Sequence, residues 1–302
     1  MAGIPFVREI EFEYGAIQQV SPMIRRVVAE NPTPFTFHGT GTYIVGQGEV
    51  AVIDPGPLLD THLDALIAAL AGERVTHILI THTHNDHSPA AEPFKKAVGA
   101  PTYGFGPHVP GRCWEGVEGL VSKGGDYDFR PDVEIADGDV IAGNGWTFEA
   151  VHTPGHIHNH LCFALKEENA LFSGDHVMGW STTVVSPPDG DMSDYMTSLD
   201  KVAGRGEEIF WPTHGPAITE PERHVHALKA HREGREDAIL ETLQDGIDDI
   251  GHIVKKLYAK VPEHLHPAAA RTTLSHLVRM IEMGRVACDG APSEAARFRP
   301  AP

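Results

Sequence analysis

The sequence is poor in cysteine. Only Cys113, Cys162 and Cys288 occur among its 302 residues, and no Cys-x-x-Cys pair is present. A sparse, odd and widely spaced set of thiols predicts neither a disulfide framework nor a cysteine-ligated metal site. It is typical of proteins from a reducing compartment, so we expect a cytoplasmic protein with free thiols.

Long apolar runs and basic residues are also scarce. No stretch reaches membrane-spanning length, and Met1–Ile10 lacks the basic start and apolar run of a secretory signal. The formal net charge is −18; residues 1–219 hold 12 Lys and Arg against 29 Asp and Glu, whereas residues 220–302 hold 12 against 13. So acidic a surface disfavours indiscriminate binding to polyanions, although it is compatible with a local basic patch.

Histidine, by contrast, is concentrated in one place. Residues 81–88 read Thr-His-Thr-His-Asn-Asp-His-Ser, directly after a stretch, Thr76–Ile80, whose composition predicts a short buried strand. The cluster therefore lies in the loop at the end of a strand, where layered α/β proteins bind ligands. Imidazole and carboxylate are the usual ligands of zinc and similar ions. We expect His82 and His84 to share one ion, and Asp86 and His87 to turn to a second ion nearby.

Four more polar residues follow strands in the same way. His156 comes after the Pro154-Gly155 turn, Asp175 closes the strand expected at 170–173, and His214 follows the strand expected at Ile209–Trp211. Asp54 ends the strand expected at Glu49–Ile53. Its position before a proline fits a turn-forming Asp as well as a carboxylate that orients a metal ligand.

The remaining pattern predicts an α/β core followed by helices. Strands are expected at 35–45 and 49–53 (a hairpin), 76–80, 101–103, 133–135, 140–142, 146–151, 161–165, 170–173 and 209–211, and helices at 58–71, 89–98 and 193–203. Residues 104–131 are expected to form an irregular loop in a pocket wall, and residues 177–192 a long ordered loop near a site. After residue 219 the pattern predicts helices at 221–243, 247–260 and 267–283, no strand, and a loose tail at 287–302. We expect a catalytic domain over 1–219 and a helical domain over 220–302.

In this order and spacing, the motifs resemble those of the metallo-β-lactamase superfamily over about residues 35–220. They are Ile-Asp-Pro-Gly at Asp54, the 81–88 cluster, Thr-Pro-Gly-His at His156, Ser-Gly-Asp at Asp175 and Thr-His-Gly-Pro at His214. Residues 171–192 and Glu263-His264-Leu265-His266 are similar to the β-lactamase-like protein 2 group. The resemblance implies the α/β class, an αββα sandwich with the metals at one edge, and a C-terminal winged-helix-like domain. Gly41 departs from it, because the family often has Asn there.

The resemblance also implies two metal ions and a ligand set. His82, His84 and His156 would hold one ion, Asp86, His87 and His214 the other, and Asp175 would bridge them. Two divalent ions can share a hydroxide that attacks an ester-like centre, and Asp86 could pass a proton to the leaving group. Zinc is the expected metal, with iron or manganese as alternatives. His160 is expected to orient a ligand or to be an ordinary strand-end histidine, and His158 has no assigned role.

The substrate class stays open at this point. The group that the chain resembles includes an endoribonuclease that acts on single-stranded RNA, so a binuclear phosphodiesterase is the first hypothesis. The acidity of the main domain counts against this hypothesis. The alternative is a small-molecule thioester or lactone hydrolase of the glyoxalase II type. Iron chemistry on oxygen or nitric oxide would call for an attached flavodoxin-like or rubredoxin-like domain, and the sequence has neither. No membrane partner is expected, and the oligomeric state, a homodimer included, is open.

Overall fold

Two facing β-sheets form the centre of the computed structural model, which describes residues 3–109 and 123–302. The first sheet has seven strands in the order β1 to β7, and the second has five in the order β12-β11-β10-β9-β8. The strands of the first sheet are β1 (Gln18–Gln19), β2 (Ile24–Val28), β3 (Gly41–Gln47), β4 (Glu49–Ile53), β5 (Arg74–Leu79), β6 (Thr102–Gly104) and β7 (Val133–Glu134). Those of the second are β8 (Val140–Ala142), β9 (Thr147–His152), β10 (Leu161–Leu165), β11 (Ala170–Gly174) and β12 (Ile209–Pro212).

A large aromatic core fills the space between the sheets. Tyr43 of the first sheet packs edge-on against Phe172 of the second, with ring centroids 5.1 Å apart, and Trp146, Phe148 and Phe163 complete the same cluster. Aromatic side chains bury the largest apolar areas, so this cluster accounts for much of the adhesion between the sheets. The paired sheets are therefore held face to face.

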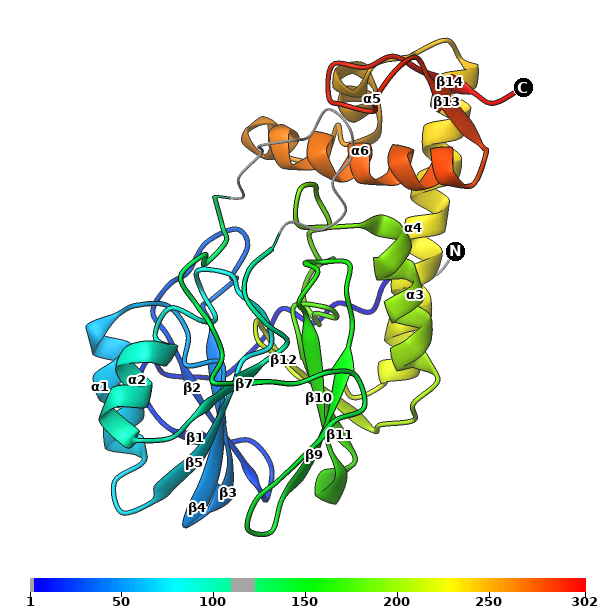
Figure 1. The fold of residues 1–302 in the computed structure, drawn as a ribbon. Helices are drawn as coiled ribbons and strands as arrows, with labels where there is room; N and C mark the ends of the chain where they lie inside the picture. The colour runs from blue at the N-terminus through cyan, green and yellow to red at the C-terminus, as the bar shows by residue number, and fades with distance from the viewer. Residues whose placement is uncertain (1–2, 110–122) are drawn as a thin grey trace.

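Helices cover the two outer faces and make a four-layer sandwich (Figure 1). Helices α1 (Asp60–Ala69) and α2 (Ala91–Val98) pack Leu66 and Phe94 on the first sheet, and helix α3 (Met192–Ala203) packs Tyr195 and Leu199 on the second. Each helix is amphipathic, so one face meets the sheet and the other meets solvent. The αββα architecture predicted from the motifs is confirmed.

Helix α4 (Pro221–Gln244) joins the sandwich to the C-terminal region. Its first half places Val225 and Leu228 in the core under the second sheet, and its second half places Ile239 and Leu243 in a separate core. That second core also contains α5 (Ile250–Leu257), α6 (His266–Glu282) and the pair of strands β13 (Val286–Cys288) and β14 (Phe298–Pro300). Because one helix belongs to both cores, the division at residue 219 stays a prediction.

Several sequence-based expectations need correction. The chain after Trp211 is not purely helical, and 287–302 is not a loose tail, because β13 and β14 pair antiparallel as a small wing. The first hairpin strand begins at Gly41 rather than at residue 35, because residues 31–40 fold into a turn around Asn31, which bonds to Thr40 through both side-chain atoms. The expected loop at 104–131 lies partly outside the described residues, as does Cys113. Cys162 and Cys288 are free thiols.

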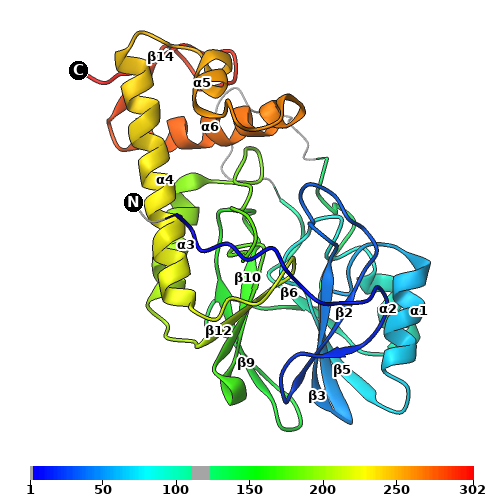
Figure 2. The same ribbon diagram turned by 180° about the vertical axis from the view of Figure 1, so that it is seen from behind.

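The N-terminal segment links the two outer layers. In the rear view it runs from beside α4 across to the side of the first sheet (Figure 2), and Val7 N–H donates to Gly179 O on the way at 2.9 Å. None of the helices in the described residues is long and apolar enough to span a bilayer. The cytoplasmic location stays a prediction.

Candidate metal centre

All of the predicted site residues lie in loops that follow strands at one edge of the sandwich. Residues 81–88 follow β5, His156 follows β9, Asp175 follows β11 and His214 follows β12. Parallel pairing aligns the ends of β4 with β5 and of β11 with β12. Because the two sheets face each other, their loops converge, and the residues that lie more than a hundred positions apart in sequence meet.

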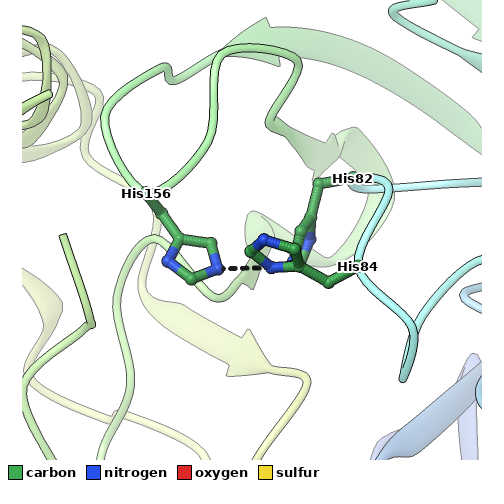
Figure 3. Close-up of side chains that lie close together, drawn as sticks. All are labelled: His82, His84 and His156. Atoms are coloured by element: carbon green, nitrogen blue, oxygen red, sulfur yellow. Dashed lines mark hydrogen bonds between the residues drawn. The ribbon is translucent and has the colours of Figure 1, made fainter. Parts of the chain in front are cut away.

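The first group consists of three imidazoles. His84 Nδ1 lies 3.0 Å from His82 Nε2 and 3.0 Å from His156 Nε2, and Figure 3 shows the three rings turned toward a common point. All three rings are largely buried. The arrangement matches the His82, His84 and His156 set that the resemblance implied for one ion.

The second group combines carboxylates with imidazoles. His214 Nε2 lies 3.1 Å from Asp86 Oδ2, and His87 Nε2 lies 3.6 Å from the same oxygen. Asp175 stands between the groups, because its Oδ1 is 3.4 Å from His214 Nε2 and its Oδ2 is 3.7 Å from His156 Nε2. One oxygen of Asp175 therefore faces each group, an arrangement that is compatible with a bridging ligand.

The outer nitrogen of every one of these imidazoles meets an acceptor. His87 Nδ1–H donates to Asp54 Oδ2 at 2.9 Å, His156 Nδ1–H to Val184 O at 2.6 Å and His214 Nδ1–H to Gly39 O at 3.1 Å. The Thr81 hydroxyl donates to Asp54, so it accepts from His82 Nδ1–H at 3.0 Å. These bonds assign the protons to the outer nitrogens and leave lone pairs pointing inward.

Three of the inward-facing atoms make no hydrogen bond among the described residues. His87 Nε2, His214 Nε2 and Asp175 Oδ1 are buried and make no hydrogen bond. Buried polar atoms without partners cost free energy, and lone pairs that face one another repel unless a cation lies between them. The donor set therefore fits divalent metal ions, three nitrogens for one and mixed nitrogen and oxygen for the other.

The electrostatics of the two groups differ. Burial lowers the pKa of His82 well below its usual value, and burial together with the charge of His84 lowers the pKa of His156 to about 4. Burial acts the same way on His87, but Asp86 and Asp175 outweigh it and hold the pKa of His87 well above its usual value. Burial thus favours the neutral, metal-binding form of His82 and His156, whereas the carboxylates beside His87 favour a protonated ring, from which a bound cation would displace the proton.

Asp54 and His160 contact the candidate ligand residues from behind. The fully buried Asp54 carboxylate holds His87, and His160 Nε2 accepts from the backbone N–H of Asp175 at 3.1 Å. Of the two interpretations that the sequence left open for each residue, the orientation of a candidate ligand agrees with this geometry. His158 is exposed, and its carbonyl accepts from His152 Nε2–H at 2.8 Å, so its ring takes no part in either group.

Two side chains that sequence reasoning missed complete the surroundings of His84. Asp189 Oδ2 lies 3.4 Å from His84 Nε2, and Asp189 Oδ1 lies 3.3 Å from His108 Nε2. His108 Nδ1–H in turn donates to Thr83 O at 3.1 Å. Nothing in the local sequence of either residue signals this contact, because it depends on two loops that meet only in the folded chain.

A cavity of about 440 Å³ opens on both groups. Its lining includes residues of the 31–36 turn, Asn31, Thr33 and Thr36, and of the long loop, Met178, Val184 and Ser186, and Phe35 and Pro57 add apolar surface. No Lys or Arg lines it within the part of the chain that the structure describes. The long loop at 177–192 therefore borders the site as predicted, and within the described part of the chain no residue after Asp189 lines this cavity.

Comparison with known proteins decides the family. The model of the metallo-beta-lactamase superfamily matches residues 36–214, and that of the beta-lactamase associated winged helix domain matches residues 250–294. The chain belongs to the metallo-β-lactamase superfamily. Its C-terminal region is the associated winged helix domain, with β13 and β14 as the wing.

Two similar proteins with assigned names come from fungi. The chain is 32% identical to the atrochrysone carboxyl ACP thioesterase AgnL7 of Paecilomyces divaricatus over 83% of its own length and 74% of that protein. It is 28% identical to the lactamase-like protein adaB of Aspergillus niger, covering 95% and 89% of the two chains. A beta-lactamase domain protein from Burkholderia ambifaria shares the fold, with a TM-score of 0.78 at 18% identity over 95% and 94%. The similarity to the β-lactamase-like protein 2 group stays a prediction.

Proposed function

We propose that the protein uses a pair of divalent metal ions to hydrolyse thioesters of apolar carboxylic acids about the size of an aromatic ring. Zinc is the expected metal. The observation that carries this proposal is the cavity, which opens on both ligand groups, offers the apolar side chains of Phe35, Met178 and Val184, and has no described Lys or Arg in its lining. A thioester is uncharged at the bond that breaks, so it needs no cationic side chain for binding. The thioesterase name of a relative at 32% identity supports the same reaction.

The assignment of ligands is part of the proposal. His82, His84 and His156 would hold one ion, Asp86, His87 and His214 the other, and Asp175 would bridge them. Ions bound there supply Lewis acidity, which lowers the pKa of a water ligand toward 7 and polarises the carbonyl. Because imidazole dominates the donors, the set suits zinc, while mixed nitrogen and oxygen ligation also accepts iron or manganese.

The chain's own groups then handle protons and position the substrate. Asp86 lines the cavity, so a carboxylate oxygen can accept the proton of the attacking water and deliver it to the leaving sulfur. The products are a carboxylic acid and a thiol, so atoms and charges balance. Phe35, whose side chain is half exposed, and Met178 offer apolar contacts for the acyl group. A cavity of about 440 Å³ accommodates a small-molecule acyl group of moderate size.

The RNA hypothesis has less support from the cavity. Proteins that bind single-stranded nucleic acid combine a positively charged groove with stacking aromatic residues. The described lining has one aromatic residue, Phe35, and three carboxylates, Asp86, Asp175 and Asp189. Phosphodiester cleavage is therefore kept as an alternative outcome of the test rather than as a second proposal.

The test is a substrate panel on one metal-loaded preparation. It compares the N-acetylcysteamine thioesters of an aromatic and a short aliphatic acid, a lactone and a single-stranded RNA oligonucleotide, with elemental analysis of the same sample. We expect the aromatic thioester to be cleaved fastest, with about two metal ions per chain. Cleavage of RNA without cleavage of either thioester would overturn the proposal.

A further inference from the structure

Helix α4 carries a buried arginine that has no ion pair among the residues that the structure describes. Arg232 is 4% exposed, donates from Nη2 to Thr183 O at 2.5 Å, and lies over the Tyr195 ring at 5.3 Å, while its Nε has no hydrogen-bond partner. Burial of a charge that no opposite charge compensates is costly. A side chain that was needed only for packing could be apolar, so the guanidinium group points to a specific role.

That role is visible in the segment that Arg232 holds. The Thr183 hydroxyl donates to the backbone carbonyls of Asp175 at 2.7 Å and His176 at 3.0 Å, which ties the segment to the backbone of the proposed bridging residue. The next residue, Val184, supplies the carbonyl that accepts from His156 Nδ1–H at 2.6 Å. The Arg232 bond therefore fixes the peptide directly before the one that orients a proposed metal ligand.

We propose that Arg232 is a positioning residue that keeps the Thr183–Val184 segment in place, so that His156 presents Nε2 to His82 and His84. The proposal rests on the proposed function only in that the three imidazoles bind a metal ion. Outer partners of this kind fix the tautomer and ring orientation of a histidine ligand. Here the outer partner is a backbone carbonyl in a long loop, which needs an external support to hold one orientation.

The same helix connects this support to the winged helix domain. One turn after Arg232, Glu236 is buried, lies 3.2 Å from His276 Nδ1 and accepts from Arg279 Nη1 at 2.5 Å, both on α6. A buried and fully bonded carboxylate fixes the register of two helices. The C-terminal domain, which does not line the cavity, therefore still acts on the metal centre by fixing α4 and, through Arg232, the loop beside His156.

The chain offers a closely matched control for a test. Arg235, on the same helix, also donates to a backbone carbonyl, Leu257 O at 3.2 Å, and also lies over a tyrosine ring, that of Tyr258 at 4.2 Å. Both of its partners belong to the C-terminal domain. Arg232→Met and Arg235→Met thus remove the same kinds of contact, one beside the site and one away from it.

Two measurements on the full chain decide the proposal. The first is hydrogen exchange of the 177–191 loop in metal-free protein, and the second is zinc affinity from competition with a chelator. We expect Arg232→Met to speed exchange in the loop and to weaken zinc binding about tenfold, at the low end of what outer partners contribute. Arg232→Lys, which keeps a donor for Thr183 O, should recover part of the affinity, and Arg235→Met should match the parent in both readouts.

Several results would overturn the inference. Unchanged loop exchange and zinc affinity in folded Arg232→Met would remove it, as would an equal loss of affinity in Arg235→Met. A parent protein that binds no zinc would end the proposed function. In that case exchange in the metal-free chain would still show whether Arg232 fixes the loop, but its role toward a metal ligand would be refuted.

Discussion

Replacement of Asp54 by asparagine tests how the site is held together. The Asp54 carboxylate is fully buried at the end of β4 and accepts hydrogen bonds from four donors. They are Thr81 N at 2.8 Å, Thr81 Oγ1 at 2.7 Å, His87 Nδ1 at 2.9 Å and Thr213 Oγ1 at 3.3 Å. Asp54 thus joins β4, the histidine loop and the loop after β12.

The expected magnitude follows from these bonds. In Asp54→Asn the amide oxygen can keep the Thr81 N–H bond, but the NH₂ group then faces His87 Nδ1–H, a buried donor that cannot turn away. The loss of a charge-assisted bond and the burial of an unpaired donor together cost roughly 3 kcal/mol of unfolding free energy. Since His87 also loses its fixed tautomer, zinc affinity should fall about 10- to 100-fold.

The assay is urea unfolding of the metal-free protein, followed by chelator competition for zinc. Thr213→Val serves as the control, because it removes only the 3.3 Å bond to the same carboxylate. We expect the control to change stability by less than about 1 kcal/mol. An Asp54→Asn protein with the parent's unfolding midpoint and zinc affinity would refute the reasoning.

Three further predictions follow from other parts of the structure. His84→Ala and Asp175→Ala should each bind fewer than two metal ions and lose at least about a hundredfold in thioester turnover, because each removes a member of the converging set. His176→Ala is the control, because the buried His176 ring contacts Tyr195 instead. Elemental analysis should show that this variant retains its metal. Burial lowers the pKa of His276 to about 4, so between pH 4 and about 6.5 the unfolded chain binds a proton there that the folded chain does not, and the unfolding free energy should fall as the pH drops through this window. In urea unfolding at a series of pH values, His276→Gln should reduce the slope of unfolding free energy against pH by about 1.4 kcal/mol per pH unit. An unchanged slope would contradict this. Phe35→Ala should raise KM for an aromatic thioester about tenfold, equivalent to about 1.4 kcal/mol, because the ring lines the cavity. The value of kcat and the melting temperature should not change, because the ring is half exposed. Kinetics equal to those of the parent would show that the acyl group lies elsewhere.

The convergence of the candidate ligand residues could be predicted because each lies in a loop that follows a short apolar strand. His84, His156, Asp175 and His214 all occupy such positions, and the strand ends of the two sheets meet at one edge. The pattern of apolar runs therefore fixed both the elements and the edge at which polar residues gather. Zinc as the metal, the number of ions and the role of each ligand stay predictions.

Features that depend on contacts between distant loops could not be predicted. Asp189 follows two prolines in a stretch without periodicity, and His108 lies in a glycine-rich loop, so neither shows that it meets His84 or Asp189. Strand β2 holds two consecutive arginines, Arg25 and Arg26, which obscure the alternation typical of a strand. The wing strands β13 and β14 are three residues each, too short for any period to appear.

The central claim is that the converging imidazoles and carboxylates bind metal ions that drive thioester hydrolysis. Its most direct test is the rate of thiol release from an aromatic N-acetylcysteamine thioester by the parent protein as purified, after chelator treatment, and after zinc is returned. The account predicts that the rate falls to background on metal removal and recovers as zinc approaches two ions per chain. A chelator-treated protein that is verified as metal-free and still cleaves the thioester at the original rate would contradict it.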